Sequence, residues 1–270
     1  MIVNQESCIG CKQCQKDCIV NDISIIEGKA FIHNQNCIKC GHCIAICPTN
    51  SVSCEDESEY KMSEVIEGRD FGINPYDLLD FMKFRRSVRS FKDTKIEEQK
   101  LKTIIEAGRY SPTGRNAQDV SYILIEKSLD EFRDKTLCAL HSLARQYLAS
   151  EDFPKELRNY LQMWLKIYQD FYTNGDDRLF YHAPNLIIIK AKDTINGALA
   201  LSRMELMINA LNLGCFISGF CKRAIEGSKE LQEYLCLEKG EQIIACLVVG
   251  YPKVRYKRSA PRKEARVLKI

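Results

Sequence analysis

Eight of the fourteen cysteines in this 270-residue chain fall in two runs with the same spacing. The runs are Cys8-x2-Cys11-x2-Cys14-x3-Cys18, followed by Ile19, and Cys37-x2-Cys40-x2-Cys43-x3-Cys47, followed by Pro48. With this spacing, eight thiolates hold two [4Fe–4S] clusters, and the fourth cysteine of each run ligates the other cluster. The runs therefore predict two ligand sets: Cys8, Cys11, Cys14 and Cys47 for the first cluster, and Cys37, Cys40, Cys43 and Cys18 for the second.

Zinc is the alternative metal, because paired C-x2-C motifs are typical of tetrahedral zinc sites. Zinc does not account for a third cysteine at the same interval or for the repetition of all four positions, so we favour iron–sulfur. His42 lies between two ligands and is interpreted as covering or tuning that cluster. Short apolar stretches, predicted as strands, lie at 2–3, 23–26, 30–33 and 51–54. Residues 1–55 resemble a bacterial ferredoxin with two [4Fe–4S] clusters.

About 200 residues follow, enough for a second domain with its own core. The acidic stretch at 56–75 predicts a linker, and residues 76–270 predict the second domain. Apolar periodicity in that domain predicts an α+β fold. The predicted helices are 76–85, 96–109, 129–150, 154–172, 195–213 and 228–235, and the predicted strands are 122–125, 185–191 and 242–250. Gly214 is predicted to cap the end of the longest apolar helix.

Charge and hydropathy restrict the possible partners only weakly. The formal net charge is +3, but from Tyr251 onward eight basic residues stand against one acid, Glu264. Nucleic acid, an anionic cofactor or solvent would each suit such a tail. No apolar stretch reaches the roughly 20 residues of a membrane span, and no apolar secretory segment precedes the first cysteine run. Thiolate ligands favour a reducing compartment, so we predict a cytoplasmic protein that binds neither membranes nor nucleic acid.

Four segments of the second domain carry arginine, glycine and polar residues in a particular order. They are Phe84-Arg85-Arg86-Ser87-Val88-Arg89-Ser90-Phe91, residues 111–118, residues 213–219, and residues 248–252 followed by Pro261-Arg262-Lys263. Together they resemble the motifs of the nitroreductase family of FMN enzymes over roughly residues 76–266. One departure is that Gln118 is followed by Asp119 and Val120, where the family usually has Pro-Trp. This difference leaves the substrate open.

The resemblance implies a homodimer with FMN at its interface. Arginine is well shaped to grip the FMN phosphate, although a solvated helix end is the alternative role for the arginines at 85–89. The implied FMN-binding residues are Arg85, Arg86, Ser87, Arg89 and Arg262 around the phosphate, Pro112, Thr113, Gly114 and Asn116 reaching across from the other subunit, and Ser218 and Gly219 near the reactive N5.

The two predicted cofactors suit one another, because clusters move single electrons whereas FMN accepts one or two. We therefore predict an FMN-dependent oxidoreductase that passes electrons from two [4Fe–4S] clusters through FMN to a nitroaromatic, quinone or activated alkene. The electron donor is ferredoxin or NAD(P)H, although no G-x-G-x-x-G motif is evident. The alternatives are a non-enzymatic electron-transfer or redox-sensing iron–sulfur flavoprotein and a nucleic-acid-binding sensor. No catalytic side chain is assigned: His182 is favoured as a strand-edge residue over a proton donor, and Cys221 as a packing thiol over a redox partner.

Overall fold

The computed structural model describes residues 1–55, 71–151 and 153–270, which form two compact units. The first unit comprises Met1–Gly72 and Thr113–Ala117, and the second comprises Ile73–Pro112 and Gln118–Ile270. Most of the predicted linker at 56–75 lies outside the described residues, so the domain boundaries at 55 and 75 stay predictions. In the described part of the chain, no helix is both long enough and apolar enough to cross a membrane.

The first unit is built from two antiparallel strand pairs and two short helices. Its elements are β1 (Ile2–Val3), α1 (Gln13–Asp17), β2 (Ile23–Ile26), β3 (Lys29–Ile32), α2 (His42–Ala45) and β4 (Val52–Ser53). Strand β1 pairs with β4, and β2 pairs with β3 through a two-residue turn at Glu27 and Gly28, where φ is 50° and 76°. Two positive φ values are typical of a tight hairpin turn that matches the strand twist. The turn therefore fixes the register of the hairpin.

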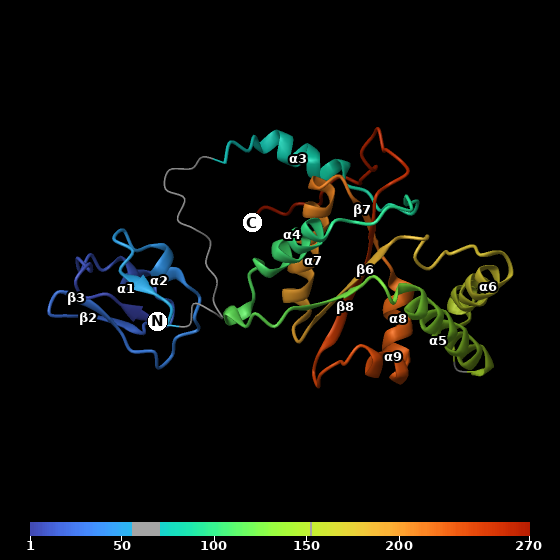
Figure 1. Ribbon diagram of the computed structural model, residues 1–270, viewed down its shortest axis with the longest axis horizontal. Coiled ribbons are helices and arrows are strands. Elements are labelled where there is room, and N and C mark those ends of the chain that lie inside the picture. The colour runs from blue at the N-terminus through green and yellow to red at the C-terminus, as the bar shows by residue number, and fades with distance from the viewer. Residues whose placement is uncertain (56–70, 152) are drawn as a thin grey trace. The chain divides into compact units, whose positions relative to one another are not determined.

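The second unit holds the remaining elements around one four-stranded sheet (Figure 1). They are α3 (Pro75–Phe84), α4 (Glu98–Arg109), η1 (Gly114–Asn116, grouped with the first unit), β5 (Ser121–Ile125), α5 (Leu129–Ala149), η2 (Lys155–Leu157), α6 (Arg158–Asn174), β6 (Asn185–Ala191), α7 (Thr194–Ala210), β7 (Gly214–Ile217), α8 (Gly219–Gly227), α9 (Lys229–Tyr234) and β8 (Gln242–Gly250). The strand order is β5-β6-β8-β7, and all pairings are antiparallel.

Helices cover both faces of this sheet, α4 and α7 on one side and α5, α6, α8 and α9 on the other (Figure 1). Successive side chains of a strand point to opposite faces. Accordingly, Leu186 and Ile188 of β6 join one core with Phe132 of α5, whereas Ile187 and Ile189 join a second core with α4 and α7. Since both faces are buried, β6 and β8 are almost continuously apolar. In a sheet with one solvent-exposed face, apolar and polar residues would alternate along each strand.

Most predicted elements of the second domain are present, whereas strand β7, helix α8 and the short turns η1 and η2 were not predicted. Gly214 does not cap the preceding helix, which ends at Ala210 with Leu211 as its C-cap; Gly214 begins strand β7 instead. Helix α8 follows at once, and its N-cap is Ser218, whose side chain accepts a hydrogen bond from the backbone N–H of Cys221. A four-residue strand that begins with glycine has too short a pattern to stand out in the sequence.

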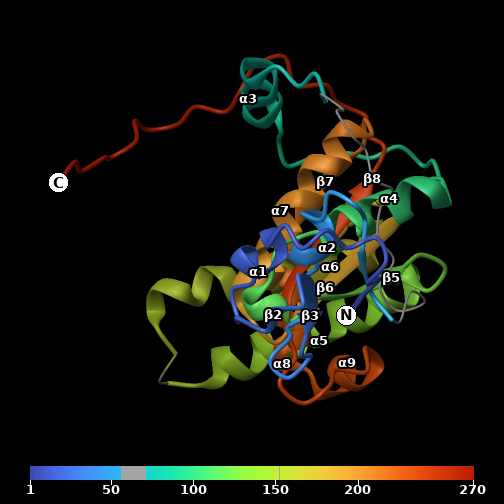
Figure 2. The ribbon, with the colours of Figure 1, turned by 90° about the vertical axis from the view of Figure 1, so that its left-hand side faces the viewer.

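Helix α3 is set apart from the sheet (Figure 2), and none of its residues is buried. Asn74 caps it by accepting hydrogen bonds from the backbone N–H groups of Tyr76 and Asp77, with Pro75 in the favourable first helical position. Five of its aromatic and aliphatic side chains nevertheless remain between 39% and 77% exposed: Tyr76, Leu78, Leu79, Met82 and Phe84. The helix is thus well capped at its N-terminus, and most of its apolar surface stays uncovered in the described part of the chain.

Candidate functional site

The loops of the two cysteine runs share the same pattern of left-handed backbone conformations. In each run the residue before the second cysteine has a positive φ, Gly10 at 65° and Lys39 at 52°. The residue after that cysteine does as well, Lys12 at 63° and Gly41 at 76°. Left-handed residues on both sides of a cysteine curl the chain tightly. The repeat seen in the sequence is therefore also a repeat of backbone conformation.

The structure groups the thiols across the two runs as well as within them. Burial, and then the nearby Cys11 and Cys47 thiols, raise the pKa of Cys14. Cys11 and Cys14 belong to the first run and Cys47 to the second. The three thiols are therefore close enough to repel one another when ionised. Binding iron relieves this repulsion, so these residues fit the first predicted ligand set.

The second predicted set lines a single small cavity. Cys18, Cys37, Cys40 and Cys43 all border it, and Ile19 and Ile38 supply part of its apolar wall. Burial, and then the nearby Cys37 and Cys40 thiols, raise the pKa of Cys43 to about 11. This crowding again favours a bound cationic group. Among the described residues, no group of three histidine, cysteine or acidic side chains is placed to hold a single metal ion. A [4Fe–4S] cluster does not need such a group, because each of its cysteines holds a different iron.

Backbone N–H groups point at several ligand sulfurs. They donate to Cys8 Sγ from Ala30 at 3.4 Å, to Cys18 Sγ from Asp22 at 3.4 Å, to Cys37 Sγ from Lys39 at 3.4 Å and to Cys47 Sγ from Ser51 at 3.3 Å. Such bonds help set the reduction potential of a cluster. His42 also borders the second cavity, with its Nδ1 3.0 Å from Asp17 Oδ2.

In the second unit, the arginine-rich segment runs beside β7. Ser87 forms a parallel bridge with Cys215, and the backbone N–H of Val88 donates to the Cys215 carbonyl at 2.9 Å. Farther along, Phe91 bridges Pro252, just beyond the end of β8. Val88 is buried at 6% exposure and anchors the segment in the core. The backbone of the segment is therefore held in place along β7.

Each arginine of this segment has a different neighbour. Arg85 Nη1 lies 3.3 Å from Glu205 Oε1 of α7, in a partly buried ion pair. The guanidinium of Arg86 lies 5.2 Å from the centre of the Tyr256 ring, and that of Arg89 lies 5.4 Å from the centre of the Phe216 ring. Cations at these distances over aromatic faces are held in place without losing their charge.

A groove of about 570 Å³ opens beside this segment. Its charged lining consists of five cations and one acid: Arg85, Arg86, Lys92, Lys253, Arg255 and Glu205. Cys215 forms part of its inner wall, and burial raises the pKa of this thiol to about 12, so it stays neutral. The groove is therefore positively charged and suits an anionic group such as a phosphate.

The structure brings together only part of the predicted FMN set. Arg85 and Arg86 line the groove, whereas Ser87, Arg89 and Arg262 are not among its lining residues. Ser218 and Gly219 lie at the start of α8. Pro112 belongs to the second unit, and Thr113, Gly114 and Asn116 belong to the first. The roles of all these residues stay predictions.

Sequence reasoning missed the groove residues outside the arginine segment. Glu205 is the only acidic residue of the apolar helix α7. An isolated acid in an apolar helix is the sequence feature that could have pointed to this residue. Lys253, Arg255 and Tyr256 belong to the basic tail. The composition of the tail showed that it is positively charged, but not which part of the fold its side chains contact. The Tyr256 hydroxyl donates to the Ser87 carbonyl at 3.2 Å, which ties the tail to the arginine segment.

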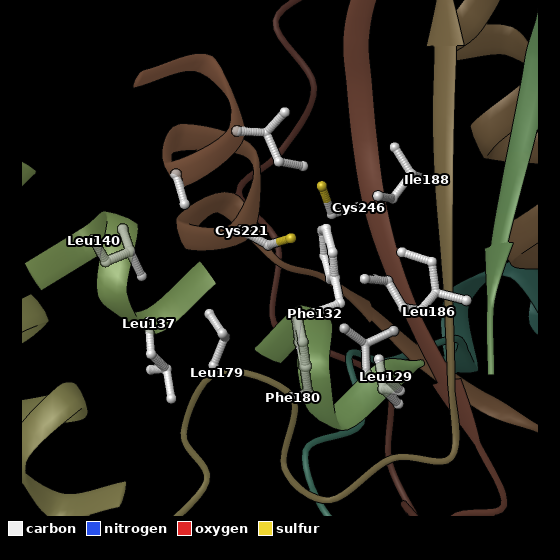
Figure 3. Close-up of a cluster of buried hydrophobic side chains, with 14 of the residues drawn as sticks. Leu129, Phe132, Leu137, Leu140, Leu179, Phe180, Leu186, Ile188, Cys221 and Cys246 are labelled. Carbon is white, nitrogen blue, oxygen red and sulfur yellow. The ribbon is translucent and has the colours of Figure 1, made fainter. Parts of the chain in front are cut away.

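His182 and Cys221 lie in structural settings. The backbone N–H of His182 donates to Asp177 Oδ2 at 3.0 Å, and its φ of 52° places it in a tight turn before β6. Cys221 is fully buried, and Figure 3 shows its sulfur facing that of Cys246 among leucine and phenylalanine side chains. Burial, together with the neighbouring Cys246, raises the pKa of the Cys221 thiol well above its usual value. These settings support the packing role favoured for Cys221.

The close approach of Gly214 to Val88 gives a testable prediction. A Cβ at Gly214 would lie 2.6 Å from Val88 Cγ2, so Gly214→Ala is expected to destabilise the protein by about 1–3 kcal/mol through overpacking. Thermal unfolding measures this, with a decrease of roughly 2–4 °C per kcal/mol. Gly219→Ala is the matched control, since a Cβ there meets nothing within 4 Å. An equal loss in both variants would contradict the proposed packing.

Comparison with known families bears on both units. Residues 82–251 match a family model described as the nitroreductase family, which covers more than half of the chain. Residues 1–48 match one described as a 4Fe-4S dicluster domain. The second match confirms the iron–sulfur interpretation of the cysteine runs over the zinc alternative. No sequence among the curated proteins matches this chain.

Several solved structures resemble the chain in fold. A nitroreductase with bound FMN from Bacteroides fragilis NCTC 9343 matches with a TM-score of 0.53 and 20% identity, over 72% of this chain and 98% of that one. A nitroreductase with bound FMN from Desulfitobacterium hafniense DCB-2 gives 0.54 and 19%, over 70% and 97%. Oxidized iodotyrosine deiodinase, bound to FMN and 3-iodo-L-tyrosine, gives 0.52 and 21%, over 71% and 97%. The predicted fold class is thereby confirmed.

Proposed function

Because the chain belongs to the nitroreductase family and carries a 4Fe-4S dicluster domain at residues 1–48, we propose that it reduces a small organic acceptor with electrons that enter at its clusters. It is an FMN-dependent oxidoreductase, and the clusters are its second redox cofactor. The observation that carries the proposal is the presence, in one chain, of two thiolate sets and a cation-lined groove.

The groove beside β7 is the proposed site of the FMN phosphate. Arg85 and Arg86 hold the anion there, with Lys253 and Arg255 adding positive charge from the tail. Arg85 exchanges its ion pair with Glu205 for the phosphate, which offers more acceptor oxygens to its planar guanidinium. The neutral thiol of Cys215 adds no competing negative charge to the groove.

The bound flavin supplies the conversion between single-electron and two-electron chemistry. The chain's own residues bind and orient it, and the buried β7–α8 turn at Ser218 gives a rigid wall: Ser218 is 3% exposed, and its backbone N–H donates to the Cys246 carbonyl at 2.8 Å. No side chain is assigned as a proton donor.

The proposed assembly is a homodimer with FMN at its interface. Helix α3 supports this, since most of its apolar side chains are exposed although its N-terminus is well capped. An exposed apolar surface of this kind is typical of an interface. The second copy would cover α3 and complete the flavin site with Pro112, Thr113 and Gly114.

The proposed donor is a low-potential carrier such as ferredoxin, with NAD(P)H as the alternative. The proposed acceptors are nitroaromatics, quinones and activated alkenes, each of which takes up a pair of electrons. We place the protein in the cytoplasm, because eight thiolate ligands require a reducing compartment.

Anaerobic stopped-flow reoxidation tests this function. Protein purified under argon is expected to contain about eight irons per chain, together with flavin. After reduction with dithionite, mixing with an acceptor panel is expected to reoxidise flavin and clusters together. Flavin-depleted protein is the control and is expected to be reoxidised far more slowly by the same acceptors.

The outcomes separate the proposed enzyme from a relay. Equal reoxidation rates with and without flavin would show that the acceptor takes electrons from the clusters directly. If no acceptor reoxidises the flavin-loaded protein, while an oxidised protein carrier does, the chain is an electron-transfer flavoprotein. Iron without flavin would remove the proposal altogether.

A further inference from the structure

Asn116 connects a loop expected to serve the flavin to the ligand loop of the second cluster. The segment Thr113–Ala117 belongs to the first compact unit, although it lies far along the chain from the cysteine runs. Within that unit, Asn116 Nδ2 donates to the carbonyls of Ile38 and Lys39, both at 3.0 Å. These carbonyls lie between Cys37 and Cys40, which are ligands of the second predicted set.

One of these hydrogen bonds continues to a ligand sulfur. The carbonyl of Ile38 and the N–H of Lys39 belong to the same peptide group. The carbonyl accepts from Asn116, and the N–H donates to Cys37 Sγ at 3.4 Å. A donor on the carbonyl polarises the peptide and strengthens the bond that its N–H makes, because hydrogen bonds in a chain act cooperatively. Asn116 therefore acts on Cys37 through one peptide group.

The loop backbone is shaped to present this side chain. Arg115, Asn116 and Gln118 have φ values of 53°, 54° and 47°. Asparagine tolerates this left-handed region better than most residues, whereas arginine and glutamine do not favour it. The backbone N–H of Asn116 donates to the Thr113 carbonyl at 3.0 Å, which closes the turn η1. The turn fixes the position from which the amide reaches both carbonyls.

We propose that Asn116 is a positioning residue that makes the second cluster, held by Cys18, Cys37, Cys40 and Cys43, the one that reduces the flavin. This inference rests on the proposed function. The step moves one electron from the reduced second cluster to the flavin, and no bond is made or broken at Asn116. The carrier then reduces the cluster again, so that two transfers supply the electron pair for the acceptor.

The test compares Asn116→Asp and Asn116→Ala with the wild type in the full-length, cofactor-loaded protein. Aspartate has the same shape as asparagine but cannot donate when ionised, and its charge opposes the two carbonyls. Asn50→Asp is the matched control, since Asn50 is an asparagine of the same unit that also has a positive φ, 50°, and its side chain is exposed. Iron and flavin content are measured first and are expected to stay unchanged.

The first readout is a redox titration of the two clusters followed by EPR. The second cluster is expected to shift to a more negative potential in both Asn116 variants, because a weaker N–H···S bond stabilises its reduced state less. The first cluster and the control variant are expected to keep their potentials. The two signals are assigned with a Cys47→Ala variant, which by the predicted ligand sets retains only the second cluster.

The second readout is the rate of flavin reduction after mixing with a reduced ferredoxin. The rate is expected to fall several-fold in the Asn116 variants, because a second cluster of more negative potential is less readily reduced by the ferredoxin. An unchanged second-cluster potential overturns the coupling between Asn116 and Cys37. A shifted potential with an unchanged rate overturns the second cluster as the exit point. If the flavin of the wild type is not reduced at all, the proposed function fails, whereas the potentials still decide the role of Asn116.

Discussion

Cys47→Ala is expected to remove the first cluster and to leave the second, although Cys47 belongs to the second cysteine run. The reason is the crossed ligand pattern: the thiol of Cys47 lies near that of Cys14 in the first run, and the cavity of the second set is lined by Cys18 instead. Iron content is expected to fall from about eight to about four per chain, measured by colorimetric iron assay and EPR. Metal binding and folding of so small a unit are coupled, so the variant is also expected to unfold at lower temperature.

Cys54→Ala is the matched control for this variant. Cys54 is 6% exposed and lies in the same small core, but it belongs to neither ligand set. Its loss is expected to lower stability through packing alone and to leave the iron content at about eight. If Cys47→Ala instead lost the second cluster, each run would ligate its own cluster, and the crossed assignment would be wrong.

Arg85→Leu is expected to weaken FMN binding by about two orders of magnitude. A charge-assisted hydrogen bond contributes about 1.5–3 kcal/mol, and the variant also leaves the Glu205 carboxylate unpaired in the groove, where it repels the phosphate. Flavin fluorescence titration of the flavin-depleted protein measures the dissociation constant. Arg85→Lys is expected to restore only part of the affinity, since an ammonium cannot bind two phosphate oxygens in one plane.

Two further variants separate the phosphate contact from general charge effects. Arg109→Leu removes an exposed arginine that pairs with Glu106 and does not line the groove, and it is expected to leave FMN affinity unchanged. Glu205→Gln frees Arg85 from its ion pair and is expected to tighten binding. Full FMN affinity in Arg85→Leu would place the phosphate elsewhere and remove the proposed role of this groove.

The helices and long strands of the second unit were predictable because their signals are local. Strands β6 and β8 carry unbroken apolar runs, and Leu101, Ile104 and Gly108 of α4 recur at helical spacing. Strand β7 was missed because its pairing partner β8 lies about thirty residues away, and four residues hold too little pattern of their own. Its position is nevertheless decisive, since the arginine segment is aligned along it through Ser87 and Cys215.

The amino-acid sequence by itself determined the iron–sulfur chemistry, because a cluster is held by cysteines in tight loops, and their spacing is written along the chain. It also pointed to the arginines of the flavin domain as a set. Only the tertiary structure decided which partner each side chain meets: Glu205 for Arg85, 120 residues away, and the Ile38 carbonyl for Asn116, 78 residues away. Such contacts depend on how separate elements pack, and side chains that are not neighbours along a helix or strand leave no periodic signal of their contact.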